Sequence, residues 1–316
     1  MPKYKLMILT ETVLDYRNRI IYSHLRNYKW KFFPRKKGIS GHYAVTRSLL
    51  DGLKKASVQY LFNEPLDYRL PETVLVLSNI DALKQAIKLK SDGSISKLYA
   101  GPNLVVLPYD HNKILCNKNI DFVVVNSDWT EKAYVEQAPE LKGKTIKWPA
   151  GVDENYWKPS SVEKNGILVY WKSKNKQFID NIVNIASKYG PVRIVKYGSY
   201  SEEEYKKALD KSEFSIFVSE SESQGIALIE AWSMDVPTLV WQGGHLKGHG
   251  WKYSSVSSAP YLTTSTGKFW ADSEQLEKQI QGCLKKKLKF GPRDWVLRNQ
   301  TDLLSAKSLI NMMDRP

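Results

Sequence analysis

The feature that most constrains the fold is an alternation of short β-branched runs with amphipathic stretches, which occurs twice along the chain. Runs such as Val74–Leu77 have the length and composition of buried strands, and Tyr43–Lys55 carries apolar residues at helical spacing. Strands that alternate with helices in this way are typical of βαβ units and a parallel sheet. After the polar stretch 158–165, the alternation restarts with the strand Ile167–Tyr170. The pattern predicts two doubly wound α/β halves joined near residue 160.

Two sheets of this kind also predict where a ligand binds. The expected strands are 4–10, 58–62, 74–77, 104–107, 122–125, 146–148, 167–170, 192–195, 214–218 and 238–241. The expected helices are 43–55, 80–89, one after Ser127, 178–189, 201–209, 225–233, 273–284 and 294–311. In open α/β sheets, ligands bind beyond the carboxyl ends of the strands, and two facing sheets place two such edges opposite one another. We therefore expect a cleft in which one half holds a donor and the other holds an acceptor.

The composition is that of an ordinary globular protein and excludes several classes. Hydrophobic residues make up 42% and charged residues 25%, which argues against a disordered chain. No apolar run approaches the ~18 residues of a membrane span, and the first ten residues are too polar for a signal peptide. Cys116 and Cys283 stand in no metal or redox spacing, so a cytoplasmic protein with two reduced thiols is expected.

The most informative stretch is a buried strand that leads into a Ser- and Glu-rich turn and then into a helix, which Gly225 opens. The first backbone N–H groups of this helix, at Gly225, Ile226 and Ala227, lack intrahelical partners and suit a diphosphate. Glu222 in the turn and Glu230 in the helix are separated by about 12 Å of helical rise, which matches the span from a hexose to a ribose. Glu222 could therefore bind sugar hydroxyls and Glu230 ribose hydroxyls. The alternative is a turn that only caps the helix, with Glu230 on a solvated face.

This stretch resembles the signature of retaining GT-B glycosyltransferases, in particular family 4. That signature has a Ser-x-x-Glu-x-x-Gly turn, two glutamates separated by seven residues and a Glu-Ala-x-x-x-x-x-Pro run. The residues in register are Glu222, Gly225, Glu230, Ala231 and Pro237. Two further phrases are similar: 150–153 resembles the family's Asn-Gly-Val-Asp near the domain junction, and 38–43 resembles its Gly-rich loop before a helix.

The resemblance implies a GT-B fold, with two Rossmann-like domains facing across a cleft. It implies an acceptor-side domain over 1–160 and a nucleotide-sugar-binding domain over 161–316, whose last helix can pack back on the first domain. The implied reaction is a metal-independent transfer of a hexose, with retention, from a UDP- or GDP-sugar to a glycan or lipid-linked glycan. No cofactor, no metal site and no side-chain nucleophile are then required.

The resemblance also implies roles for individual residues. The catalytic residues are Glu222, His111 and Lys172. The donor-binding residues are Glu230, Gly225, Ile226, Ala227, Lys176, Gly198, Ser199, Gly243 and Gly244. The acceptor-side residues are Gly38, Ser40, Gly41 and His42. The family usually has an Arg followed by a Lys after the first strand of the second domain. Here only lysines stand in that segment, so point charges replace bidentate phosphate recognition.

Metal and phosphate motifs of other enzyme classes do not occur in the sequence. There is no Asp-x-Asp, no Walker loop, no strand-linked GxGxxG and no Gly-x-Ser-x-Gly elbow. His245 and His249 have no carboxylate or Cys at a convincing spacing, so a zinc site is rejected. His111 follows the expected strand 104–107, close to where the family often has a histidine near the reacting sugar.

A second feature is the basic segment Arg17–Lys37, which interleaves eight Lys and Arg residues with aromatic residues and has no acidic residue. The whole chain carries a formal charge of +14, which attracts phosphorylated substrates, anionic lipid surfaces or nucleic acid. Since the segment precedes the Gly-rich loop, we expect it to hold an anionic or lipid-linked acceptor or an anionic membrane surface, which would make the protein peripheral to the membrane. The alternative is that the segment is exposed to solvent, contributes a few aromatic side chains to the core and binds no ligand.

Two other functions stay open at this point. One is a DNA-binding or DNA-glucosylating GT-B protein, for which duplex binding would fall steeply with salt. The other is a catalytically inactive GT-B partner subunit, which would bind no nucleotide sugar.

Overall fold

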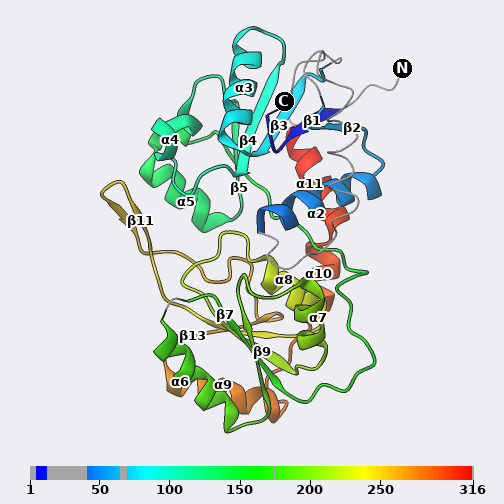
Figure 1. The fold of residues 1–316 in the computed structure, drawn as a ribbon, viewed down its shortest axis with the longest axis vertical. Helices are drawn as coiled ribbons and strands as arrows, with labels where there is room; N and C mark the ends of the chain where they lie inside the picture. Colours follow the sequence, from blue (N-terminus) through cyan, green and yellow to red (C-terminus); the bar gives the residue numbers. More distant parts are fainter. Residues whose placement is uncertain (1–4, 13–40, 65–69, 174, 315–316) are drawn as a thin grey trace.

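The computed structural model describes residues 5–12, 41–64, 70–173 and 175–314 and contains two parallel sheets, one above the other in Figure 1. The first sheet consists, in spatial order, of β2 (Tyr60–Phe62), β1 (Leu6–Leu9), β3 (Thr73–Ser78), β4 (Lys97–Asn103), β5 (Phe122–Val125) and β6 (Thr145–Lys147). The second consists of β13 (Gly267–Trp270), β10 (Thr238–Trp241), β9 (Phe214–Val218), β7 (Ile167–Trp171) and β8 (Val192–Lys196). The two doubly wound α/β halves predicted from the sequence are confirmed.

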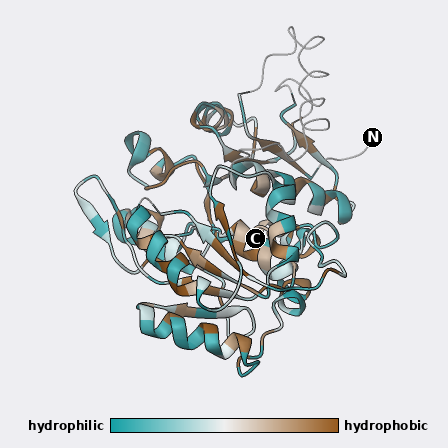
Figure 2. Ribbon diagram, turned by 60° about the horizontal axis from the view of Figure 1, so that its bottom comes forward, coloured by the Kyte–Doolittle hydropathy of each residue, from teal (hydrophilic) through white to brown (hydrophobic). Residues whose placement is uncertain are grey.

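Helices cover both faces of each sheet. In the first half these are α2 (Gly41–Lys55), α3 (Ile80–Ser91), α4 (Asp110–Lys113) and α5 (Asp128–Gln137), with short 3-10 turns η2 (Ile114–Cys116) and η3 (Pro139–Leu141). In the second half these are α6 (Lys176–Ser187), α7 (Glu202–Asp210), α8 (Ile226–Ser233), α9 (Ser273–Leu284) and α10 (Pro292–Asn299), and the chain ends with α11 (Asp302–Met313), which packs on the first half. Figure 2 shows hydrophobic colour concentrated in the strands and hydrophilic colour on the outer sides of the helices. Among the described residues, no helix has both the length and the apolar content to cross a bilayer.

Most expected elements lie within two residues of their predicted bounds, but the expected strand 104–107 is wrong. Those residues form a bent loop, and the strand of this unit is β4, which contains Gly101-Pro102. A Gly-Pro pair looks like a strand breaker in sequence. It is tolerated here because Pro102, which lacks an N–H, stands in no register pair. The strand β4 pairs with β5 only through Tyr99 and Ala100, and its pairing with β3 shifts register between Ala100 and Asn103.

The expected single helix 294–311 is also wrong, because α10 and α11 are separate. α10 packs against α8 in the second half, whereas α11 packs against α2 and contributes Ala306 and Leu309 to a core cluster of the first half. Figure 1 shows α11 beside α2. At the break, Thr301 pairs with Val152 in an isolated bridge. The domain boundary at residue 160 stays a prediction.

One hairpin has no counterpart among the expected elements. Between β10 and β13 the chain forms β11 (Leu246–Gly248) and β12 (Trp251–Tyr253), an antiparallel pair that projects from the second sheet toward α5 (Figure 1). Its Tyr253 packs in a small core cluster with Ala133 of α5. The hairpin therefore connects the second half to the first.

Candidate functional site

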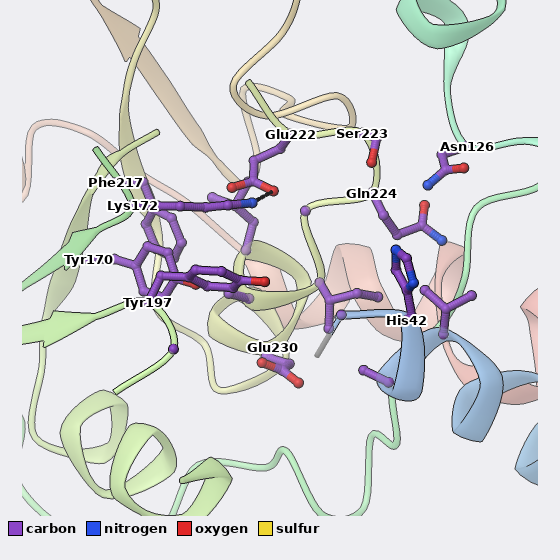
Figure 3. A pocket seen from close by; sticks show the side chains of 18 of the residues that line it. His42, Asn126, Tyr170, Lys172, Tyr197, Phe217, Glu222, Ser223, Gln224 and Glu230 are labelled. Carbon is purple, nitrogen blue, oxygen red and sulfur yellow. Dashed lines mark hydrogen bonds and ion pairs between the residues drawn. The ribbon is translucent and has the colours of Figure 1, made fainter. Parts of the chain in front are cut away.

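Two adjoining cavities lie between the halves. The first has a volume of about 290 Å³ and lies between the start of α2 and the carboxyl ends of β7, β8 and β9 (Figure 3). The second has a volume of about 370 Å³ and lies beside the loop after β4 and the helix α5. The residues that line both cavities are His42, Asn103, Asn126, Lys172, Glu222 and Ser223. Two ligands, one in each cavity, would therefore contact each other at this shared wall.

The centre of the shared wall is an ion pair. Lys172 Nζ, just beyond the end of β7, lies 2.9 Å from Glu222 Oε2 in the loop after β9 (Figure 3). Ser219 Oγ donates to the other carboxylate oxygen of Glu222 at 2.8 Å, and the Lys172 ammonium lies 4.8 Å from the centroid of the Tyr197 ring. Trp129 of the first half donates its indole N–H to the Glu222 carbonyl oxygen at 2.9 Å. Among the described residues that line the two cavities, Lys172 is the only Lys or Arg.

The N-terminus of α8 opens into the first cavity. Its N-cap Gly225 has φ 66°, a left-handed conformation that favours glycine, and it offers no side chain to cap the helix. The predicted residues Gly225, Ile226 and Ala227 all line the first cavity. The first N–H groups of a helix have no intrahelical partner and, with the helix dipole, favour an anion.

Two residues that line the first cavity have side-chain amide nitrogens without a hydrogen-bond partner among the described groups. Gln224 is 6% exposed, and its Nε2 is buried and unpaired, while its Oε1 lies 2.6 Å from the Tyr261 hydroxyl. Asn103 lines both cavities, and its Nδ2 is also buried and unpaired. Leaving a buried N–H donor unsatisfied is costly, so these two amide nitrogens, on residues that line the cavities, are candidates to donate to oxygen atoms of a ligand.

Glu230 lies at the far end of the first cavity, on α8, and is only 6% exposed (Figure 3). Near it, the hydroxyls of Tyr170 and Tyr200 lie 3.1 Å apart. Burial, and then the charge of Glu230, raises the pKa of Tyr200, so this hydroxyl stays protonated. The structure thus brings Glu222 and Glu230 into one cavity, with the start of α8 between them.

The histidines predicted from the sequence take different positions. His42, at the start of α2, lines both cavities, and partial burial lowers its pKa. His111 lines only the second cavity and is an exposed residue of α4 with φ 51°. Gly41 begins α2 and lines the first cavity. Gly38 and Ser40 lie outside the described residues.

Several predicted donor-binding residues do not line either cavity. Lys176 is an exposed residue at the start of α6, and Ser199 is exposed next to Gly198, which does line the first cavity. Gly243 and Gly244 shape the turn after β10 instead. A Cβ at Gly244 would lie 2.3 Å from the carbonyl oxygen of Glu220.

The second cavity has apolar lining residues beside the polar residues of the shared wall. Its apolar lining residues are Pro102, Leu104, Val105, Val106, Val125, Trp129, Tyr134 and Leu246. Leu246 belongs to the hairpin β11–β12, so the second half contributes directly to a cavity whose other walls come mainly from the first half. The sequence patterns considered above did not predict this contribution.

The hairpin is held against the first half by two polar contacts. His249 Nε2 lies 2.7 Å from Asp110 Oδ1, and Trp251 donates its indole N–H to Glu136 at 3.1 Å. Burial raises the pKa of Asp110, but hydrogen bonds from His249 and from two backbone N–H groups give a net decrease. Among the described residues, no group of three or more His, Cys, Asp or Glu side chains could hold a metal ion.

No family model and no curated protein matches this sequence. Solved structures do match over almost the whole chain. HepE from Anabaena in complex with UDP and glucose gives a TM-score of 0.63 at 9% identity, covering 98% of this chain and 99% of that chain. The chain has the GT-B fold. The apo form of the lipopolysaccharide outer core galactosyltransferase WaaB gives a TM-score of 0.58 at 9% identity, covering 98% of both chains. A sucrose-phosphate synthase from Thermosynechococcus elongatus gives 0.56 at 12% identity, also covering 98% of both chains.

The predicted GT-B fold class is therefore confirmed, and the cleft with the two cavities is the cleft between the two Rossmann-like domains of that fold. Membership of family 4 stays a prediction, because these identities show the fold alone.

Proposed function

We propose that this chain is a glycosyltransferase that binds a nucleotide-sugar donor in the first cavity and an acceptor in the second. The observation that carries the proposal is the Lys172–Glu222 ion pair, which stands on the wall shared by the two cavities. The start of α8 opens into the first of these cavities. This arrangement supplies positive charge where a diphosphate would depart and polar groups where a sugar would lie.

The donor is proposed to lie along α8. Its diphosphate would accept hydrogen bonds from the N–H groups at the start of α8. Its ribose would donate to Glu230, and its base would lie against Tyr197 and Gly198, which line the same cavity. Its sugar would lie beside Glu222 and the unpaired amide nitrogen of Gln224. Support for a UDP-sugar comes from HepE, which was solved with UDP-glucose.

We propose a retaining reaction. The bond from the sugar C1 to the diphosphate oxygen breaks, and the bond from C1 to the acceptor oxygen forms on the same face. The acceptor proton passes to the departing diphosphate, so no side chain is needed as a nucleophile. Electrostatic stabilisation of the charge that develops on the diphosphate is then the main contribution of the protein, and Lys172 is placed to provide it.

The proposed acceptor is a glycan or lipid-linked glycan in the second cavity. A sugar ring has apolar faces and a polar rim. The apolar lining residues, which include Trp129, suit the faces, and the shared polar wall suits the hydroxyls. The basic segment Arg17–Lys37, which lies outside the described residues, is proposed to hold the acceptor or an anionic membrane surface.

The donor site is tested by a thermal-shift screen of UDP, GDP, ADP and their sugars. A ligand at 100 times its dissociation constant adds about 2.7 kcal/mol to the free energy of unfolding, so we expect one nucleotide to raise Tm by several degrees. Replacing Glu230 by Gln should weaken binding of that nucleotide about tenfold or more, because hydrogen bonds to a charged group are lost. Glu203→Gln is the matched control, since Glu203 is exposed on α7 and lines neither cavity. Unchanged affinity in Glu230→Gln would contradict the proposed donor position.

Metal independence gives a separate prediction. In the proposed site Lys172 and the N-terminus of α8, both of which belong to the protein, stabilise the charge of the diphosphate. We therefore expect EDTA to leave the rate of nucleoside diphosphate release from the donor unchanged within about twofold. The rate is measured with EDTA and with added Mg²⁺ or Mn²⁺, and a strict requirement for either ion would refute this part of the proposal.

A further inference from the structure

An ion pair that the proposed reaction does not use joins the two halves beside the first cavity. Arg47, on α2 of the first half, has its Nη1 2.8 and 2.9 Å from the two carboxylate oxygens of Glu202, on α7 of the second half. The side chains are only 18% and 11% exposed, respectively. Glu202 lines the first cavity, whereas Arg47 stands behind it.

Arg47 also faces a second acidic residue of the cavity. Burial lowers the pKa of Arg47, but the carboxylates of Glu202 and Glu230 outweigh this effect and raise it overall. The guanidinium lies 5.8 Å from the centroid of the Tyr43 ring on its own helix. Ile226 at the start of α8 packs against the core cluster to which α2 contributes, so the positions of α2 and α8 are coupled. The charge of Arg47 is therefore held close to two carboxylates that belong to the second half.

The charges of the residues that line the first cavity indicate a role for Arg47. Among the described residues that line it, three carboxylates, Glu202, Glu222 and Glu230, stand against one lysine, Lys172. That lysine is already paired with Glu222. Glu202 and Glu230 therefore make an acidic wall at one end of the cavity, and a diphosphate brings further negative charge to it. Like charges repel strongly in a partly buried site, where solvent screens them poorly.

We propose that Arg47 is a positioning residue for the donor, which offsets part of the negative charge of Glu202 and Glu230 so that the first cavity accepts a nucleoside diphosphate. This inference rests on the proposed donor site. Because Arg47 belongs to the first half, its charge offsets these carboxylates of the second half only when the two halves are held together. The Arg47 side chain thereby links donor binding to the approach of the two halves. It acts through Glu202 and Glu230 and does not contact the donor.

The test is the affinity for UDP, measured by titration calorimetry, in a double-mutant cycle of Arg47→Met and Glu202→Gln. Charge compensation predicts that Arg47→Met weakens UDP binding at least tenfold and that Glu202→Gln alone leaves it unchanged or tighter. The double variant should recover most of the loss, because the unbalanced carboxylate is gone with the arginine. Arg47→Lys keeps the positive charge, so its affinity for UDP should fall by less than threefold. Arg298→Met is the matched control, since Arg298 is exposed on α10 and lines neither cavity.

The outcomes separate this inference from the proposed function. If the pair is only a structural tie between the halves, Glu202→Gln weakens UDP binding as much as Arg47→Met does, the double variant recovers nothing, and the inference is overturned. Equal affinity in wild type and Arg47→Met overturns it as well, while leaving the donor site intact. Should Arg47→Met not fold, Glu202→Gln decides alone, because a tie predicts weaker binding and charge compensation does not. A wild type that binds no nucleoside diphosphate overturns the proposed function and this inference with it.

Discussion

Replacing Lys172 by Met is expected to lower turnover by a factor of about 10² to 10³, which is typical when one preorganised electrostatic group is removed from an active site. Among the described residues that line the two cavities, no other Lys or Arg is present to take over its role. Turnover is measured as release of the nucleoside diphosphate from the donor that the binding screen identifies. Since the charge on the diphosphate grows as the bond to the sugar breaks, kcat should fall more than donor affinity.

Lys176 provides the control for this prediction. It follows Lys172 by four residues in the same segment, but it stands exposed at the start of α6 and lines neither cavity. Lys176→Met should therefore keep the turnover of the wild type within about twofold. Equal losses in the two variants, or full activity in Lys172→Met, would show that the diphosphate does not depart beside Lys172.

The prediction for turnover also applies to Glu222, the ion-pair partner of Lys172. Its carboxylate holds the Lys172 ammonium at 2.9 Å, so Glu222→Gln should lower turnover both by weakening the contact with the sugar and by releasing the lysine. Residues that act as a unit are strongly non-additive. The double variant Lys172→Met with Glu222→Gln should therefore lose little more turnover than Lys172→Met alone.

The sequence predicted most of the fold because strands of a parallel sheet are buried on both faces. Such strands read as continuous apolar runs, and Phe214–Val218 and Phe122–Val125 are found with the expected bounds. β4 was missed because its apolar run is short and is interrupted by Gly101-Pro102. The hairpin was missed because its two short strands, Leu-Lys-Gly and Trp-Lys-Tyr, contain no run of β-branched or apolar residues.

The candidate site was predictable where its residues are close in sequence. Glu222, Gly225 and Glu230 form one turn and one helix, so their spacing along the chain determines their spacing in the cavity. The pairing of Arg47 with Glu202 joins residues 155 positions apart, and no local pattern indicates such a contact. The choice between Lys172 and Lys176 likewise depends on where β7 ends and α6 begins, which composition does not reveal.

The helix α2 connects the cleft to the rest of the molecule. Its start places His42 at both cavities, its middle carries Arg47, and its last turns pack against α11. The close approach of α11 depends on Gly52, where a Cβ would lie 2.2 Å from the carbonyl oxygen of Asp302. The stability of the junction between α2 and α11 therefore affects the geometry of the cleft. This junction contains a buried acidic side chain.

Asp302 lies at this junction, and its side chain is only 2% exposed. Burial raises its pKa from 3.8 to about 7, although a hydrogen bond with Ser48 and the charge of Lys55, 3.7 Å away, act in the opposite direction. In the unfolded chain the carboxyl releases its proton near pH 4, whereas in the folded protein it keeps the proton until about pH 7. The folded state thus binds more protons between these values, and its stability falls as pH rises through them.

We expect the free energy of unfolding of the wild type to fall as pH rises, and we expect Asp302→Asn not to show this fall. Each pKa unit corresponds to about 1.4 kcal/mol, so this group lowers the free energy of unfolding of the wild type by up to about 4 kcal/mol between pH 4 and pH 7. Asp302→Asn has no charge to bury, so the variant should gain on the wild type across this range and keep a constant lead above about pH 8. Urea unfolding at a series of pH values measures the difference, with Asp81→Asn as the control because Asp81 is 71% exposed. Parallel curves for wild type and Asp302→Asn would mean that the junction tolerates the ionised acid, and that Lys55 then compensates its charge in full.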